Sequence, residues 1–133
     1  MRFEGRLVLF NDETFKRTVF TPETKILYLG ENLRRFEGRV PFVFEWQAEK
    51  VIGYVDAFIF DEDGIIVKGD ITYDLFFDAV KEVDQIGIGA TWTILESHSD
   101  PSGSKILDTL QLIYISTKFN VEKDDKRLMR LED

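Results

Sequence analysis

The chain has 133 residues, a formal net charge of −8 and no cysteine. This length favours one domain that buries roughly 68% of the surface of its unfolded chain, and the lack of cysteine excludes disulfide scaffolds and thiolate zinc sites. The charge argues against a general nucleic-acid or anionic-membrane binder, because both surfaces would repel the protein. No apolar run approaches the ~20 residues that span a bilayer, and charges at residues 1–6 interrupt any secretory leader. We therefore expect a soluble protein in a cytoplasm.

Strand patterns dominate the first part of the chain. Alternating apolar residues predict a strand over 3–10, a turn at 11–13 and a short return strand over 15–20. The threonine, proline and glutamate at 21–23 resemble a helix start, with a cap, an early proline and an acid in the first turn. Aromatic and β-branched residues over 41–46 predict a buried strand.

The middle of the chain predicts a hairpin and a helix. Residues 51–60 and 65–71 flank Asp61-Glu62-Asp63-Gly64, a turn that ends in the Asp-Gly typical of hairpins. Apolar residues at helical spacing over 73–83 predict an amphipathic helix whose other face is acidic and solvated.

The last third predicts two long strands, 85–96 and 105–118, joined by a polar, exposed loop over 97–104. From residue 122 onward charges dominate, so we expect one domain over 1–121 and a charged C-terminal tail over 122–133. The pattern as a whole indicates a β-rich α+β domain with one or two helices and six or seven mostly antiparallel strands. Strands this long usually close into a barrel.

Several segments have the order and spacing of a known family. They are Phe3–Asn11, with a glycine before an apolar run and Phe-Asn; Val40–Phe44; Ile52–Val55 with Gly64–Ile71; the helix over 73–83 before Ile86–Gly89; and Leu107–Asn120. This succession resembles the prohead (capsid maturation) serine proteases of tailed phages, which share a β-barrel with the herpesvirus assemblins. The resemblance covers nearly all of residues 3–120 and implies the same barrel.

The resemblance also implies where catalytic residues would stand. The family has a histidine about five residues after the proline of its entering strand, and a serine directly before an apolar-glycine pair. Counted from Pro41, the first position is at or beside Trp46, and the second is Gly87. Asp108 and Gln111 occupy the region where active members carry a supporting polar residue, but they would have nothing to orient. We therefore expect a protein that is not an enzyme.

His98, the single histidine, raises the alternative of a relocated nucleophilic site. Four serines lie within six residues of it: Ser97, Ser99, Ser102 and Ser104. Because neighbours on a polar loop rarely hold a hydroxyl and a base at ~3 Å, we favour a solvated loop. Thr91 and Thr93 have no base nearby and are weaker candidates still.

Two further features have a structural interpretation. The acids at 61–63 suggest a calcium loop, but the twelfth position from Asp61 is Thr72, where such a loop needs glutamate. We expect no metal and no cofactor. Trp46 and Trp92 could line a pocket, although tryptophans in strands more often fill a core; at the histidine position, Trp46 would plug the former substrate cleft.

The resemblance without catalytic residues predicts a non-catalytic phage structural protein that binds the capsid lattice as a decoration (cement) or head-assembly protein. Its partner would be a phage capsid or scaffold protein, in the virion or in the host cytoplasm during assembly; homo-oligomerisation stays open. The expected partner contacts lie in the loop and the tail: Ser97, His98, Ser99, Asp100, Leu128, Met129 and Leu131. The alternatives are a divergent active maturation protease that cleaves scaffold or capsid protein, and a non-viral binding module on a similar barrel.

Overall fold

A computed structural model describes residues 1–12, 17–80, 83, 85–122 and 124–132. These residues form ten strands, one α-helix and one short 3₁₀-helix. In chain order the elements are β1 (Arg2–Leu9), β2 (Thr18–Val19), β3 (Lys25–Tyr28), β4 (Glu31–Asn32), the 3₁₀-helix (Leu33–Arg35), β5 (Val40–Phe44), β6 (Gln47–Phe60), β7 (Gly64–Ile71), α1 (Leu75–Val80), β8 (Ile86–Ser99), β9 (Lys105–Lys118) and β10 (Leu128–Glu132).

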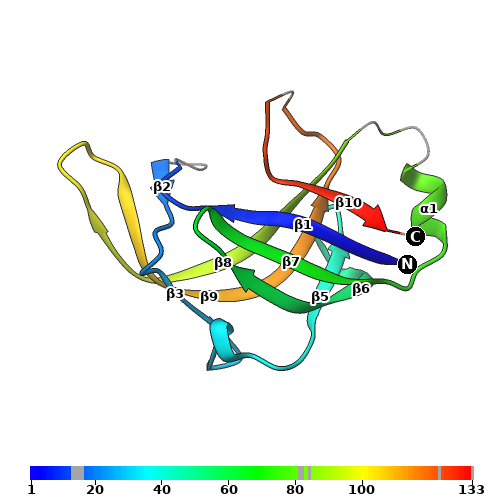
Figure 1. Ribbon diagram of the computed structural model, residues 1–133, viewed down its shortest axis with the longest axis horizontal. Coiled ribbons are helices and arrows are strands. Elements are labelled where there is room, and N and C mark those ends of the chain that lie inside the picture. The colour runs from blue at the N-terminus through cyan, green and yellow to red at the C-terminus, as the bar shows by residue number, and fades with distance from the viewer. Residues whose placement is uncertain (13–16, 81–82, 84, 123, 133) are drawn as a thin grey trace.

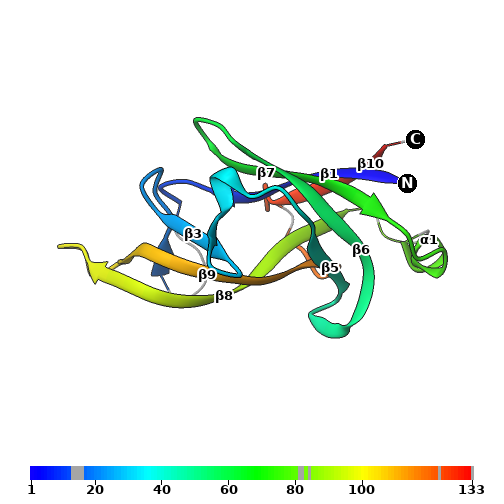
Figure 2. The ribbon, with the colours of Figure 1, turned by 90° about the horizontal axis from the view of Figure 1, so that it is seen from below.

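Seven of the strands close into a mixed barrel, in the order β9-β5-β6-β7-β1-β10-β8 and back to β9. Six of the seven neighbouring pairs are antiparallel, and β5 runs parallel to β9, with Phe42 opposite Ile115. A ring with an odd number of strands cannot alternate direction throughout, so at least one parallel pair is required. The predicted β-rich, mostly antiparallel barrel is confirmed. Figure 2 shows β1, β7 and β10 on one side and β8 and β9 on the other.

The barrel interior is filled by aliphatic and aromatic side chains from all parts of the chain. Phe3 on β1 stacks on Phe42 on β5, with ring centroids 4.5 Å apart. Val55, Leu110 and Ile115 are fully buried beside them. Such large side chains remove much apolar surface from water, which is the main driving force for closing the barrel.

The β8–β9 hairpin extends well beyond the barrel, away from α1 and the chain ends (Figure 1). One edge of β9 pairs with β8 along its whole length. Its other edge pairs in turn with β5, β3 and β2. The strand β9 therefore joins the closed barrel to the extended arm.

The hairpin predicted around 61–64 is confirmed, because Phe60 on β6 pairs with Ile65 on β7. The Asp61 carboxylate accepts hydrogen bonds from the backbone N–H groups of Asp63 and Gly64 at 3.0 and 2.8 Å. The amphipathic helix is also present, and among the described residues of the predicted 73–83 it comprises Leu75–Val80. Residues 81, 82 and 84 lie outside the described part of the chain.

The helix predicted from 21–23 is wrong. The side chain of Thr24 accepts a hydrogen bond from the Thr21 N–H at 2.9 Å and donates to the Leu107 carbonyl at 2.7 Å. These bonds close a turn, after which β3 pairs with β9. Partners on β9, distant in sequence, thus override a local capping signal.

The exposed loop predicted over 97–104 is also wrong in part. Residues 97–99 belong to β8, where Ser99 pairs with Lys105. The turn itself is confined to 100–104 and is closed by Asp100, which accepts hydrogen bonds from the N–H groups of Ser102 and Ser104, both at 2.9 Å.

The charged segment over 122–133 is not a tail outside the barrel, because residues 128–132 form β10. This strand lies between β1 and β8, with Met129 opposite Gly5 and Ile86. Glu4 on β1 forms ion pairs with Arg130 on β10 and Lys68 on β7, at 2.7 and 3.5 Å. The Arg130 hydrogen bond holds the pKa of Glu4 below its ordinary value. The charged residues of this segment thus stabilise a strand of the barrel through ion pairs with its neighbour β1. No helix among the described residues is long and apolar enough to cross a membrane.

Candidate functional site

The candidate site begins at the turn between β5 and β6. Phe44 pairs with Gln47, so Glu45 and Trp46 alone make the connection. Both have positive φ, 46° and 66°. A two-residue hairpin turn of this kind strongly prefers Asn-Gly or Gly-Gly, because a Cβ atom is strained in the left-handed region. A glutamate and a tryptophan there must be held by surrounding contacts.

Strand β9 supplies those contacts. The N–H groups of Trp46 and Glu45 donate to the hydroxyls of Ser116 and Thr117, at 2.7 and 3.0 Å. The Tyr114 hydroxyl donates to the Trp46 carbonyl at 3.1 Å. Ser116 and Thr117 are 0% exposed, so their two acceptor hydroxyls are shielded from water, whereas the Tyr114 hydrogen bond lies at the surface.

The turn places Trp46 against the backbone of β8. A Cβ atom at Gly89 would lie 2.6 Å from Cη2 of the Trp46 ring. At Gly87, two residues earlier, a Cβ atom would lie 2.5 Å from a methyl of Val121 and 3.0 Å from the Lys118 carbonyl. Trp46 therefore packs on Gly89, two residues along β8 from Gly87, while Val121 and Lys118 fill the space at Gly87 itself.

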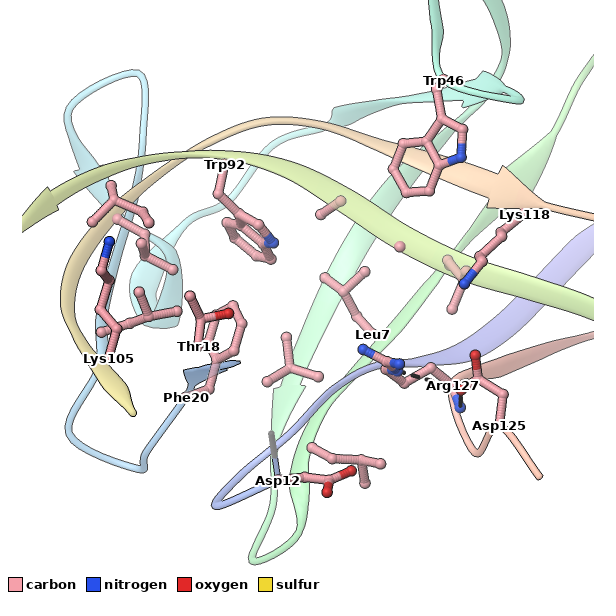
Figure 3. A pocket seen from close by; sticks show the side chains of 18 residues that line it. Leu7, Asp12, Thr18, Phe20, Trp46, Trp92, Lys105, Lys118, Asp125 and Arg127 are labelled. Carbon is pink, nitrogen blue, oxygen red and sulfur yellow. Dashed lines mark hydrogen bonds and ion pairs between the residues drawn. The ribbon is translucent and has the colours of Figure 1, made fainter. Parts of the chain in front are cut away.

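Beside this contact, a cleft of about 620 Å³ follows the inner side of β8. Its walls are mostly apolar and come from β1, β8, β9 and the segment after β2: Leu7, Leu9, Phe20, Trp92, Ile94 and Leu107. Phe20 and Trp92 meet edge to face, with ring centroids 5.3 Å apart, and both point into the cleft (Figure 3). Trp92 is thus a wall of the cleft as well as part of the apolar interior.

Charged side chains of both signs stand around the rim of the cleft, among them Asp12 after the end of β1. Lys105 and Lys118 lie towards its two ends, and Arg127 lies on the side of Lys118 (Figure 3). Arg127 is paired with Asp125 at 3.3 Å. Among the described residues, neither Lys105 nor Lys118 forms an ion pair.

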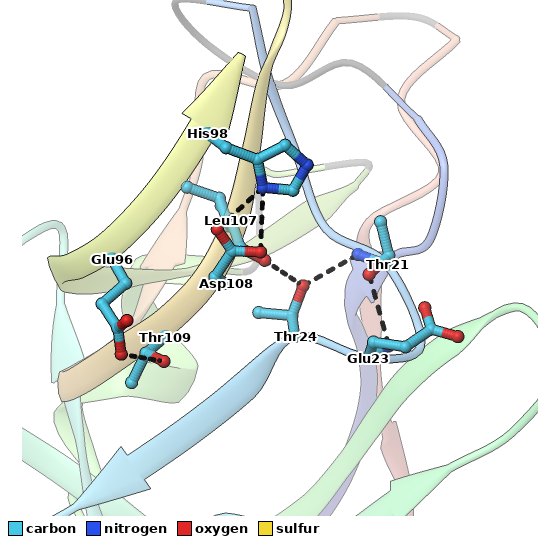
Figure 4. A network of polar contacts seen from close by, with 8 residues as sticks. All are labelled: Thr21, Glu23, Thr24, Glu96, His98, Leu107, Asp108 and Thr109. Carbon is cyan, nitrogen blue, oxygen red and sulfur yellow. Dashed lines mark hydrogen bonds and ion pairs between the residues drawn. The ribbon is translucent and has the colours of Figure 1, made fainter. Parts of the chain in front are cut away.

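His98 does not line this cleft and lies on the extended arm, opposite Ile106. Its Nδ1 atom is 2.8 Å from the Asp108 carboxylate on β9 (Figure 4). Within the described residues, Asp108 is its only hydrogen-bonding partner. Both side chains are well exposed. The pair orients the imidazole without shielding it from water.

The serines around His98 are not assembled with it. Ser97 and Ser99 are its neighbours in β8, and successive side chains of a strand point to opposite faces. The Ser102 hydroxyl donates to Asp100 at 2.7 Å, and this hydrogen bond is the main cause of the lowered pKa of that carboxyl. Ser104 is buried within the same turn. The described residues thus contain no hydroxyl hydrogen-bonded to the imidazole.

The remaining expected partner contacts lie in β10. Leu128, Met129 and Leu131 are opposite Gly87, Gly5 and Phe3, respectively. Met129 is buried and the two leucines are half-buried. Sequence reasoning did not identify Ser116 and Thr117 as important. Their signal is two adjacent small polar residues that directly follow the apolar run Leu112–Ile115 in the same strand.

Two acids of the β6–β7 hairpin, Asp56 and Asp61, are paired with arginines. Asp61 forms a two-fold hydrogen-bonded pair with Arg6, with both N···O distances 2.8 Å, which lowers the pKa of Asp61 to about 2. Asp56 pairs with Arg2 in the same way, and the pKa of that carboxyl is lowered too. In the part of the chain that the structure describes, no group of three or more His, Asp or Glu side chains is arranged to hold a metal ion.

No protein-family model and no curated protein sequence matches the chain. The fold, however, is similar to that of the protease of Kaposi's sarcoma herpesvirus (KSHV). A crystal structure of that enzyme with a hexapeptide phosphonate inhibitor gives a TM-score of 0.56 at 13% identity, and covers 96% of this chain and 63% of the protease. A structure of the protease with an allosteric inhibitor gives 0.53 at 12% identity, and covers 96% and 73%. At this identity the likeness concerns the fold alone: the chain has a viral-protease-like barrel.

Proposed function

We propose that this protein is a non-catalytic relative of the viral capsid-maturation proteases, and that it binds a phage capsid or scaffold protein as a decoration or head-assembly protein. The observation that carries the proposal is the contact between Trp46 and Gly89. The indole occupies the surface of β8 beside Gly87, the position where the resembling family has its nucleophile. A bulky side chain rests there in place of a reacting centre.

The cost of this arrangement supports the same proposal. Two non-glycine residues with positive φ, at an estimated 1–2 kcal/mol each, are held by two buried hydroxyls on β9. The Trp46 side chain thus covers part of β8 in a strained conformation, which fits a protein whose fold binds a partner protein and does not catalyse a reaction. In the virion or in the host cytoplasm during assembly, its partner would be the capsid or scaffold chain that a protease of this kind recognises.

Particle composition tests the proposal. Purified phage particles and their assembly intermediates would be analysed by quantitative mass spectrometry, and the isolated protein would be co-sedimented with capsids that lack it. We expect lattice-like copy number in one of these particles, and saturable co-sedimentation. If the chain is found in none of the particles and does not sediment with them, the proposal fails.

One observation favours the alternative of an active protease. Asp108 orients His98 as a carboxylate orients the base in a serine hydrolase. An alkylphosphonate probe, which reacts with activated serines, separates the two functions. The proposal expects no labelling of the wild-type protein, with the His98→Ala variant as a matched control; labelling that disappears in that variant would establish the alternative.

A further inference from the structure

In the part of the chain that the structure describes, the barrel wall is complete over only part of its height. On one side, β10 pairs with β1 at residues 2–5; on the other, it pairs with β8 at Ile86 and Gly87. One further hydrogen bond runs from the Ile88 N–H to the Arg127 carbonyl, at 3.1 Å. Beyond this point no described strand lies between β1 and β8. We call the opening between residues 7–9 of β1 and residues 89–94 of β8 the seam.

The seam exposes main-chain groups that can bind another strand. In an antiparallel ladder, alternate residues direct their N–H and C=O groups to one neighbouring strand, and the others direct theirs to the opposite side. Over 89–99, β8 pairs only with β9 among the described residues. About half of its N–H and C=O groups therefore point away from β9, along the open edge. Open edges of this kind recruit extended peptides.

The floor of the seam suits alternate apolar side chains. Ala90, Trp92 and Ile94, at every second position of β8, line the cleft together with Phe20 and Leu107. Six residues of strand, from 89 to 94, extend over roughly 20 Å. A cleft of about 620 Å³ beside them accommodates several side chains of an added strand.

The rim selects the charge of the added segment. The protein has a net charge of −8, yet Lys105 and Lys118 stand at the cleft without an ionic partner among the described residues. The cleft is also lined by Asp12, so its three cations outnumber its two carboxylates, Asp12 and Asp125. The other rim cation, Arg127, is already paired with Asp125. A second copy of the chain would bring the same strong negative charge, whereas a short acidic segment would meet the two lysines.

We propose that the seam binds an extended, acidic segment of a partner protein, which pairs with the open edge of β8 and continues the line of β10 between β1 and β8. This inference rests on the proposed function only for the identity of the partner. The chemistry of the site is independent of it: main-chain pairing, apolar side chains at alternate positions, and carboxylates towards Lys105 and Lys118.

A synthetic peptide with alternating valine and glutamate over nine residues, blocked at both ends, is a suitable probe. Since the chain has two tryptophans, the Trp46→Phe variant leaves Trp92 in the cleft wall as the only tryptophan reporter. We expect a saturable change in Trp92 emission, and slower amide hydrogen exchange for residues 89–99. The valine–lysine peptide, and a valine–glutamate peptide N-methylated at alternate residues, should not bind.

Charge reversal at the rim supplies the matched comparison. Lys105→Glu/Lys118→Glu should weaken binding about tenfold. Lys25→Glu/Lys50→Glu, at exposed sites outside the cleft, changes the net charge equally and should have little effect. If the double variant does not fold, the peptide affinity of Lys105→Glu alone can be measured instead, because Lys105 is exposed. Equal binding of the lysine peptide, no binding of the acidic peptide, or an unchanged affinity in the rim variants would overturn the inference.

The two proposals fail in different ways. Loss of peptide binding in the rim variant, with unchanged co-sedimentation with capsids, would remove the seam as the capsid contact but leave the proposed function standing. If the acidic peptide binds but the protein does not associate with particles, the seam is a peptide-binding site and the proposed capsid or scaffold partner is rejected. Self-association of the protein through β8, seen as a dimer that the acidic peptide does not dissociate, would replace the peptide by a second copy and overturn the inference.

Discussion

Cη2 of Trp46 lies 2.6 Å from the point where Gly89 would carry a Cβ atom, so the indole fits directly against the bare backbone of β8. The fit depends on both partners. Trp46 is directed there by a strained turn, and Gly89 leaves the space. Because Trp46 is 41% exposed, the contact covers part of the strand without burying the whole ring.

The first prediction concerns Gly89→Ala. The added methyl group occupies the place of the ring, which should swing towards solvent and lower the free energy of unfolding by about 1 kcal/mol. In a Trp92→Phe background, the Trp46 emission should shift to longer wavelength. The same change in a Trp46→Ala background meets no ring and should be near neutral; an equal loss in both backgrounds would contradict the proposed contact.

The second prediction concerns the strain at Trp46. Because the residue has a φ of 66°, Trp46→Gly should be more stable than Trp46→Ala by about 1 kcal/mol. Ile59, on β6 and similarly exposed, is not among the residues with positive φ and serves as the control. There alanine should be the more stable of the two. Chemical denaturation of the four variants measures both differences, and the same order at both sites would argue against strain in the turn.

Ser116→Ala is predicted to loosen the clamp. The half-buried N–H of Trp46 loses its acceptor, and because a fully buried unsatisfied donor costs about 1–3 kcal/mol, we expect a loss at the lower end of that range, about 1 kcal/mol. The exposed Ser97→Ala should change the stability by less than about 0.5 kcal/mol. Thermal unfolding gives both values, and hydrogen exchange should show faster exchange at Glu45 and Trp46 only in the first variant. A loss below that of Ser97→Ala would show that the turn does not depend on this hydroxyl.

Restoring a serine at Gly87 should not restore chemistry. Its Cβ atom would meet a Val121 methyl at 2.5 Å and the Lys118 carbonyl at 3.0 Å. We expect Gly87→Ser to be destabilised by about 1–3 kcal/mol and to resist alkylphosphonate labelling, even combined with Trp46→His. Adding Val121→Ala removes the side-chain obstacle and should recover part of the stability. Labelling of any of these variants would show that the site retains more of the reaction geometry than its packing suggests.

Acid should weaken the β6–β7 hairpin through Asp61. The Arg6 hydrogen bonds lower the pKa of Asp61 in the folded protein to about 2, from an ordinary 3.8. Since the folded pKa is the lower one, this stabilisation is present above about pH 4 and is lost as the pH falls from about 4 to 2. The Asp61→Asn variant keeps an acceptor for the turn but has no charge to titrate. Melting temperatures between pH 5 and 2 should therefore converge for the two proteins, and curves that stay parallel would contradict this role.

Local signals in the sequence predicted the parts of the fold whose causes are local. The acid-rich turn at 61–64 fixes its own hairpin through the side chain of Asp61. The barrel and the proximity of Trp46 to the Gly87 region followed from a resemblance in the order of segments. The structure confirms the barrel, and it places Trp46 against Gly89 on β8, two residues from Gly87; that these positions match catalytic residues stays a prediction.

Signals that depend on distant partners were misread. The helix start at 21–23 became a turn because Thr24 binds the Leu107 carbonyl, 83 residues away. The segment over 122–133 was interpreted as a solvated tail or a docking segment, because five acids and four bases dominate it. The charge of Arg130 is accommodated in the barrel by its hydrogen bond to Glu4, 126 positions earlier. The seam could not be predicted from the sequence for the same reason. It exists because β10, which begins at Leu128, is shorter than β1 and β8 on either side of it.

The pairing of β1 with β10 also sets the order of events during synthesis. The strands from Arg2 to Lys118 can leave the ribosome and pair with one another, but the ring cannot close until Leu128–Glu132 has emerged. Until then, the edges of β1 and β8 stay unprotected over their whole length, and a contact of such long sequence separation forms slowly. Nascent chains halted before residue 128 should therefore be the species most dependent on chaperones, and the most prone to aggregate.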